Sequence, residues 1–206
     1  MKTGFLGMLK LGTVLALFAT AACVMLAFVY TGTKSIIEQQ DEKNLQAALI
    51  ELFPDADNFE PIEDITSPDS DVAIINAYVA VVNNKIIGAA LTVSRAGYSG
   101  PIRTMVGVNT DGLITRAKIM EISDTPGLDA NAASPLYFVD RANGITFYGQ
   151  FTGKKTTDPF IVKNDVAAIT ASTITSVAVS NSVKAAGLAV KAWLAEKGIS
   201  GEGEAK

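Results

Sequence analysis

The stretch from Val72 to Val93, VAIINAYVAVVNNKIIGAALTV, sets the architecture of the rest of the chain. Two runs rich in valine, isoleucine and alanine, Val72 to Val82 and Lys85 to Val93, lie on either side of Asn83-Asn84. Asparagine tolerates the positive φ of a tight turn, so this pattern predicts a β-hairpin.

A second hairpin is predicted after the first, because Arg103 to Val108 and Leu113 to Ile122 flank the turn sequence Asn109-Thr110-Asp111-Gly112. Together the two hairpins predict a four-stranded, mostly antiparallel sheet. The elements predicted beyond it are a short helix near Ala132 to Asp140, a strand from Ile145 to Phe151, and a helix from about Ile174 to Glu196. This helix is low in charge and has five large apolar residues available for burial, Val177, Leu188, Val190, Trp193 and Leu194. Strands followed by packed helices indicate the α+β class.

The N-terminal segment predicts a single membrane anchor. From Leu11 to Tyr30 no residue is charged, and this run supplies the roughly 20 apolar residues that span a bilayer. A cleavable signal peptide ending at the A-x-A step of Ala19 and Ala21 is the alternative, but the apolar run continues past it and favours a retained helix. Lys2 and Lys10 precede the span, which favours a cytoplasmic N-terminus and an extracytoplasmic domain on the inner or plasma membrane.

The chain divides into four predicted regions, with the anchor at 1–34, a helix and linker at 35–71, the main domain at 72–198 and a flexible tail at 199–206. Apolar residues in Ser35 to Phe53 recur at the spacing of an amphipathic helix, which Pro54 ends. Asp55 to Asp71 is rich in proline, aspartate and serine, which predicts loops.

The composition excludes several classes of function. The net charge of -4 and the absence of a basic cluster argue against a nucleic-acid partner. The chain has no histidine, which excludes His-ligated metals and Ser-His or Cys-His catalysis. Cys23 is the single cysteine, so no intramolecular disulfide forms, and Thr20 before it disfavours a lipoprotein signal. Redox or transfer chemistry in this chain therefore requires a cofactor.

A cluster of hydroxyl residues, Thr170-Ala171-Ser172-Thr173-Ile174-Thr175-Ser176, stands directly before the last predicted helix. One interpretation is a helix N-cap, in which a Ser or Thr side chain satisfies the unpaired amides of the first turn. The other is a phosphate site, because a helix N-terminus offers free N–H groups and a partial positive charge.

Three segments together resemble a known family. They are Gly97-Tyr98-Ser99-Gly100-Pro101-Ile102, Asp124-Thr125-Pro126-Gly127-Leu128 and the hydroxyl cluster at 170–176. In order and spacing they are similar to the FMN-binding domain of the G subunit of the Rnf electron-transport complex, a domain shared with the C subunit of the sodium-pumping NADH:quinone oxidoreductase.

The resemblance implies that FMN is attached to Thr173 through a phosphoester bond, and that the chain has no catalytic residue and no metal ligand of its own. The implied cofactor-binding residues are Thr173, Thr125, Gly127, Leu128, Ser172, Ile174 and Thr175. The implied partners are a separate flavin transferase that uses FAD, and the other membrane and redox subunits of a complex that couples ferredoxin oxidation and NAD reduction to ion pumping.

Three residues differ from the family pattern. Ala171 stands where glycine is usual, so a backbone that requires positive φ there carries a strain of roughly 1 kcal/mol or more. Ser172 stands where alanine is usual, and the upstream acidic residue is Asp165, slightly farther away than in the family.

Three alternatives belong to other classes. Gly97-Tyr98-Ser99-Gly100 superficially resembles the nucleophile elbow of a hydrolase, but Pro101 replaces the second glycine and no histidine is present. The chain's short length favours the Rnf subunit over the quinone-reductase subunit. A tethered binding or assembly module without redox activity is compatible with the composition, and a non-dissociable yellow chromophore distinguishes it from a flavoprotein.

Overall fold

The computed structural model describes residues 2–122 and 129–199. It contains two compact units, Met1–Gln46 and Ala47–Lys206. The prediction of four regions bounded at residues 34, 71 and 198 stays a prediction.

Helix α1, Lys2–Leu52, contains the predicted span. It is the one helix among the described residues that is long and apolar enough to cross a membrane, with a mean hydropathy of 2.3 in its apolar window. Within it, Thr13, Thr20 and Thr31 each donate a hydroxyl hydrogen bond, of 2.6 to 2.8 Å, to the carbonyl four residues earlier. These bonds satisfy hydroxyl groups that find no water partner in hydrocarbon.

The helix predicted from Ser35 to Phe53 is confirmed as the continuation of α1, which ends at Leu52, directly before Phe53 and Pro54. A proline disfavours helical backbone at the residue before it, which accounts for this end.

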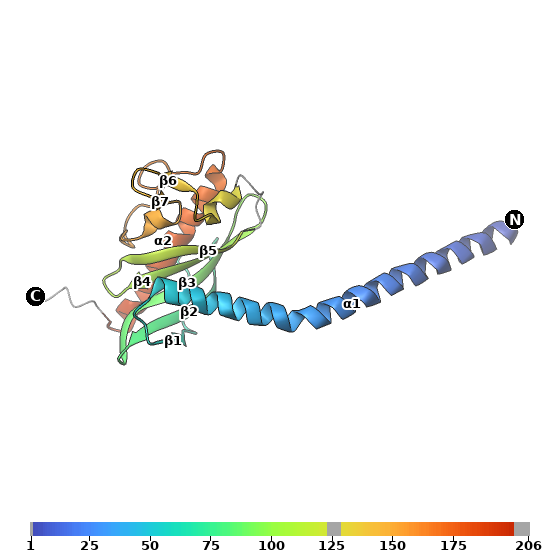
Figure 1. The fold of residues 1–206 in the computed structure, drawn as a ribbon, viewed down its shortest axis with the longest axis horizontal. Coiled ribbons are helices and arrows are strands. Elements are labelled where there is room, and N and C mark those ends of the chain that lie inside the picture. Colours follow the sequence, from blue (N-terminus) through green and yellow to red (C-terminus); the bar gives the residue numbers. More distant parts are fainter. Residues whose placement is uncertain (1, 123–128, 200–206) are drawn as a thin grey trace, which may run out of the picture. The chain divides into compact units, whose positions relative to one another are not determined.

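The predicted antiparallel sheet is confirmed, with one more strand than expected (Figure 1). Its five strands are adjacent in chain order, and they are β1 Asn58–Pro61, β2 Ala73–Val82, β3 Lys85–Ala96, β4 Pro101–Asn109 and β5 Ile114–Ile122. Asn83 and Asn84 form the turn between β2 and β3 with φ of 48° and 62°, as their residue type predicts.

Strand β1 lies in the segment predicted as loops, and that prediction was wrong for these residues. The strand has four residues and ends in Pro61. It pairs with β2 at the edge of the sheet, where Phe59 lies opposite Ala80. A strand this short at a sheet edge, with a proline, carries too little alternation to be recognised in the sequence.

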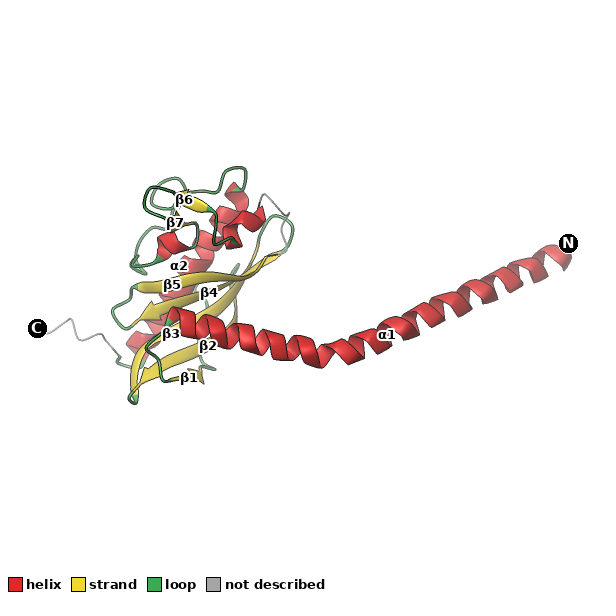
Figure 2. Cartoon of the chain, viewed as in Figure 1, coloured by secondary structure: helices red, strands yellow, loops and turns green. Residues whose placement is uncertain are grey.

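The segment between the sheet and the last helix also differs from prediction (Figure 2). In place of a helix at 132–140, the chain forms a 3-10 helix, η1 Asp129–Ala133, and strand β6 Phe138–Asp140. In place of a strand at 145–151, it forms β7 Ile145–Thr146 and a second 3-10 helix, η2 Gly149–Phe151. Phe147 and Phe151 are fully buried and pack edge to face at 5.8 Å, an arrangement that favours a helical turn over a strand.

Helix α2, Thr173–Glu196, confirms the predicted last helix and packs against β3 and β4 (Figure 1). Val190, Trp193 and Leu194 are buried in the core, as predicted. Leu188 is half-buried, and Val177 is 39% exposed, so burial of Val177 was wrongly predicted. Small residues, among them Ala178, Ala185, Ala186 and Ala189, form much of the face that α2 presents to the core.

A second apolar layer involves the end of α1, which belongs to the second compact unit from Ala47 onward. Leu52 and Phe53 are 2% and 4% exposed. A Cβ atom added to Gly88 would lie 2.8 Å from the Phe53 ring, and one added to Gly107 would lie 3.1 Å from it. The two glycines therefore leave the space that this ring fills.

An ion-pair cluster joins the same helix end to strand β5. The carboxylate of Glu51 accepts from Lys118 Nζ at 2.5 Å and from Arg116 at 3.5 Å. These side chains are more than a third exposed, so the pairs contribute modestly to stability beside the buried apolar contacts.

Candidate functional site

The hydroxyl cluster lies at the start of α2, as predicted. Ser172 occupies the N-cap position and the helix begins at Thr173, but the Ser172 side chain does not make the capping hydrogen bond to the first turn. The N-cap interpretation is therefore right about position and wrong about that bond.

Burial divides the hydroxyls of the cluster into two groups. Ser172, Thr175 and Ser176 are 2%, 0% and 0% exposed, whereas Thr170 and Thr173 are exposed. Thr173 is the exposed hydroxyl on the first residue of α2, where free backbone N–H groups and the positive end of the helix dipole stabilise an anion.

Ser176 links the first turn of α2 to the loop that precedes it. Its hydroxyl accepts the N–H of Ile169 at 3.0 Å and donates to the carbonyl of Ser172 at 2.8 Å. Both bonds are buried, so they close the loop from Ile169 to Ser172 against the first turn of α2 and limit the motion of Thr173.

Ala171 has φ of 63°, in the left-handed region that favours glycine. The family pattern has glycine at this position, so the strain expected from the sequence is present in the structure. A strained residue persists only where its surroundings fix it.

We expect Ala171→Gly to raise the free energy of unfolding by about 1 kcal/mol, because glycine adopts the left-handed region without a Cβ clash. Thermal unfolding of the two proteins measures the difference. Ala168→Gly is the matched control, since φ at Ala168 is not positive, and it should be neutral or destabilising. An Ala171→Gly protein no more stable than its parent would contradict the strain.

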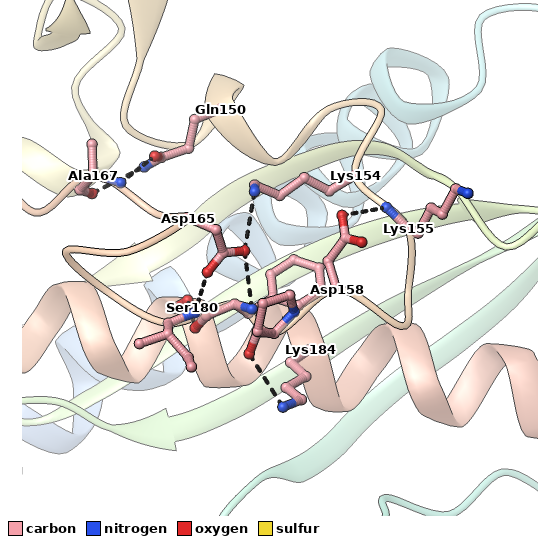
Figure 3. A network of polar contacts seen from close by, with 11 residues as sticks. Gln150, Lys154, Lys155, Asp158, Asp165, Ala167, Ser180 and Lys184 are labelled. Atoms are coloured by element: carbon pink, nitrogen blue, oxygen red, sulfur yellow. Dashed lines mark hydrogen bonds and ion pairs between the residues drawn. The ribbon is translucent and has the colours of Figure 1, made fainter.

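Asp165, the upstream acidic residue, organises the loop that precedes the cluster (Figure 3). Its carboxylate accepts the N–H groups of Phe160 and Ile161 at 3.1 and 2.6 Å, and Lys154 Nζ lies 3.2 Å away. Ser180 Oγ of α2 donates to the Phe160 carbonyl at 2.7 Å, so the loop is fixed to the helix. Partial desolvation raises the pKa of Asp165, but the Ile161 N–H, Lys154 and the Phe160 N–H together hold that pKa below its ordinary value.

The lowered pKa of Asp165 determines how its contribution to stability changes with pH. A carboxyl group with a lowered folded-state pKa stabilises the fold above its ordinary pKa of 3.8, and the contribution is lost as pH falls through the folded value. We expect Asp165→Asn to lower the free energy of unfolding by about 1 to 2 kcal/mol at neutral pH. Unfolding measured at a series of pH values should show that the difference shrinks below pH 3.8. A difference independent of pH would contradict the charged role of Asp165.

The remaining predicted site residues fall into two groups. Ile174 is 56% exposed, beside Thr173 on the first turn of α2. Thr125, Gly127 and Leu128 lie outside the described residues. Their assignment to the flavin pocket stays a prediction.

Ser99, the residue of the hydrolase alternative, lies in the turn between β3 and β4, where the Gly97 N–H donates to the Gly100 carbonyl at 2.7 Å. A nucleophile elbow joins a strand to a helix, whereas this turn joins two strands. The structure therefore removes the geometric basis of that alternative.

Comparison with known proteins supplies the family. The model of the FMN-binding domain matches residues 97–187, and the model of the RnfG N-terminal region matches residues 1–52. The chain is 30% identical to the G subunit of the Na(+)-translocating ferredoxin:NAD(+) oxidoreductase complex of Acetobacterium woodii, over 84% of this chain and 87% of that protein. The chain belongs to the G-subunit family of Rnf complexes.

Other members of this family support the assignment. The G subunit of the ion-translocating oxidoreductase complex of Shewanella piezotolerans is 32% identical over 88% of each chain, and that of Methanosarcina acetivorans is 27% identical over 86% of this chain and 91% of its own length.

Among solved structures, the crystal structure of Shewanella oneidensis NqrC matches with a TM-score of 0.43 and 18% identity, over 64% of this chain and 65% of that chain.

Membership of the G-subunit family confirms the expected class of protein. The protein is a membrane-anchored subunit of an oxidoreductase complex. It carries an FMN-binding domain, which includes β4, β5 and the start of α2. The named relatives favour the Rnf assignment over the quinone-reductase subunit and over a tethered module without redox activity.

Proposed function

We propose that this protein relays electrons through an FMN group joined by a phosphoester bond to Thr173, within an Rnf-type ferredoxin:NAD oxidoreductase coupled to ion translocation. The observation that carries the proposal is the exposure of Thr173 at the first residue of α2, while Ser172, Thr175 and Ser176 beside it are buried. A separate modifying enzyme can therefore reach the Thr173 hydroxyl from solvent without unfolding α2.

The helix N-terminus favours a phosphate at this place. The amides of the first turn have no intrahelical acceptor, and the helix dipole adds a partial positive charge. No acidic residue lies in the first turn of α2 to oppose a bound anion. Bound FMN would supply one-electron chemistry, and the domain would set its potential through local polarity.

The attachment requires a second protein. A threonine hydroxyl is a weak nucleophile without a base, and the chain contains no histidine. In the proposed step, Thr173 Oγ bonds to the FMN phosphorus of FAD, the pyrophosphate P–O bond breaks, AMP leaves, and the hydroxyl proton passes to a base of the flavin transferase. Atoms and charge balance without any further reactant.

The proposed orientation places the N-terminus in the cytoplasm and the domain outside it. Lys2 and Lys10 precede the apolar run, in agreement with the bias of positive charge toward the cytoplasm. Free flavin outside the cytoplasm is scarce, so a covalent bond retains the cofactor where equilibrium binding would lose it. Relatives from Acetobacterium woodii and Clostridium ljungdahlii are named as parts of Na(+)- and proton-translocating complexes, and the proposal accordingly leaves the ion open.

The proposal is tested by producing the full chain with and without a flavin transferase, then viewing denaturing gels under ultraviolet light. The expected result is a fluorescent band of this chain only when the transferase is present. A dark band in its presence would refute the proposed attachment, and fluorescence in its absence would refute the need for a second protein.

A further inference from the structure

The backbone that leads into Thr173 lies in neither a regular strand nor a helix. We call residues 167–172 the presenting segment. It contains the left-handed Ala171, with φ of 63°. No regular ladder satisfies this segment. The Ser172 N–H bonds within the segment to the Ile169 carbonyl. The N–H groups of Ala167, Ile169 and Thr170 are instead bound by side chains from outside the segment.

Gln150 of η2 holds the first residue of the presenting segment. Its Oε1 accepts the Ala167 N–H at 2.7 Å, and its Nε2 donates to the Ala167 carbonyl at 3.2 Å (Figure 3). Nε2 also donates to the Phe147 carbonyl at 2.8 Å, which orients the amide. One side chain thus engages both polar groups of one backbone residue, as a neighbouring strand would.

Tyr137 binds the presenting segment at the residue before the strained Ala171. Its hydroxyl accepts the N–H of Thr170, adjacent to Ala171, at 3.3 Å. Tyr137 is half-buried and packs against the main core, so the position of its hydroxyl is set by the body of the domain. The two contacts join residues 33 and 17 positions apart in the chain.

We propose that Tyr137 and Gln150 are positioning residues for the modification of Thr173, a role that rests on the proposed covalent attachment. They hold the presenting segment, with Ala171 in its left-handed conformation, so that the transferase meets the Thr173 hydroxyl in one orientation. Left-handed backbone is unfavourable for alanine, and without these contacts the segment populates other conformers. An acceptor that is presented only part of the time reacts in proportion to that population.

The test measures the rate at which the full chain, in detergent, takes up flavin from FAD with a flavin transferase. Tyr137→Phe removes one hydroxyl and keeps the ring, and Gln150→Leu removes all three amide hydrogen bonds at similar volume. Gln150→Glu keeps an acceptor for the Ala167 N–H but loses the donor to the Ala167 and Phe147 carbonyls. Tyr148→Phe is the control, because Tyr148 is a half-buried tyrosine two residues before Gln150 and lies outside the presenting segment.

We expect kcat/KM for flavin uptake to fall about tenfold in Tyr137→Phe and in Gln150→Leu, with an intermediate value for Gln150→Glu. The final stoichiometry at long times should equal that of the parent, since Thr173 is intact. The Tm of Tyr137→Phe should move by no more than about 4 °C, the effect of one hydrogen bond. Gln150→Leu loses three bonds and should lower the Tm further, so the rates are compared at a temperature at which every variant is folded. Tyr148→Phe should match the parent throughout.

Equal rates for the parent, Tyr137→Phe and Gln150→Leu would overturn the positioning role while leaving the proposed attachment in place. A slower rate that is matched by an equal loss of folded protein would also overturn it, because the residues would then act only on stability. A parent chain that takes up no flavin under any condition would instead refute the proposed attachment.

Discussion

We expect Thr173→Ala to remove all covalent flavin from the chain and to leave the domain folded. The substitution deletes the one exposed hydroxyl on the first residue of α2, and neither Thr175 nor Ser176 takes over because both are fully buried. Because Thr173 is exposed, the free energy of unfolding should change by no more than about 0.5 kcal/mol. In-gel fluorescence after production with a flavin transferase measures the first effect, and thermal unfolding measures the second.

Thr170→Ala is the matched control for this experiment. Thr170 is an exposed threonine three residues earlier in the same cluster, but it precedes the helix and lacks the first-turn amides. We expect its fluorescence to equal that of the parent. Loss of the label from Thr170→Ala, with Thr173→Ala still labelled, would move the attachment to the other exposed hydroxyl.

Phe53→Ala should lower the free energy of unfolding by about 3 to 5 kcal/mol, the usual cost of removing a buried aromatic ring. Phe53 is 4% exposed and its ring lies over Gly88 and Gly107, whose missing side chains leave a space that nothing else fills once the ring is removed. Trp193 is the single tryptophan of the chain and is buried in the core, so its fluorescence reports unfolding of the full chain in denaturant.

Ile50→Ala serves as the comparison, since Ile50 lies in the last turn of α1, three residues before Phe53, and is 57% exposed. Its removal should change the free energy of unfolding by about 0.5 kcal/mol or less. Similar stability for Phe53→Ala and Ile50→Ala would show that the end of α1 is not part of the core of the domain.

The sequence predicted those elements whose signals are local. Asn83-Asn84 marks a turn because asparagine accepts positive φ, and the hairpins follow from it. The apolar run at 11–30 requires no tertiary partner to be recognised as a span. The missed elements depend on packing. Strand β1 exists through pairing with β2, and the turn at Phe147 and Phe151 exists because both rings enter the core.

The site shows the same division. The place of Thr173 at the start of α2 and the strain at Ala171 both follow from the local pattern and its resemblance to a family. Tyr137 and Gln150 were not recognised, because each reaches the presenting segment across an interval in the chain that carries no motif. Phe53 was placed at the end of a predicted helix, but nothing nearby in the sequence indicates that Gly88 and Gly107 accommodate its ring.

Intact-mass spectrometry of the chain purified from cells that contain a flavin transferase shows whether Thr173 carries FMN. We expect a mass greater than that of the polypeptide by one FMN less one water, with the added mass on the peptide that contains Thr173. A chain with the mass of the unmodified polypeptide, or one with flavin on a peptide that lacks Thr173, would contradict the proposed attachment.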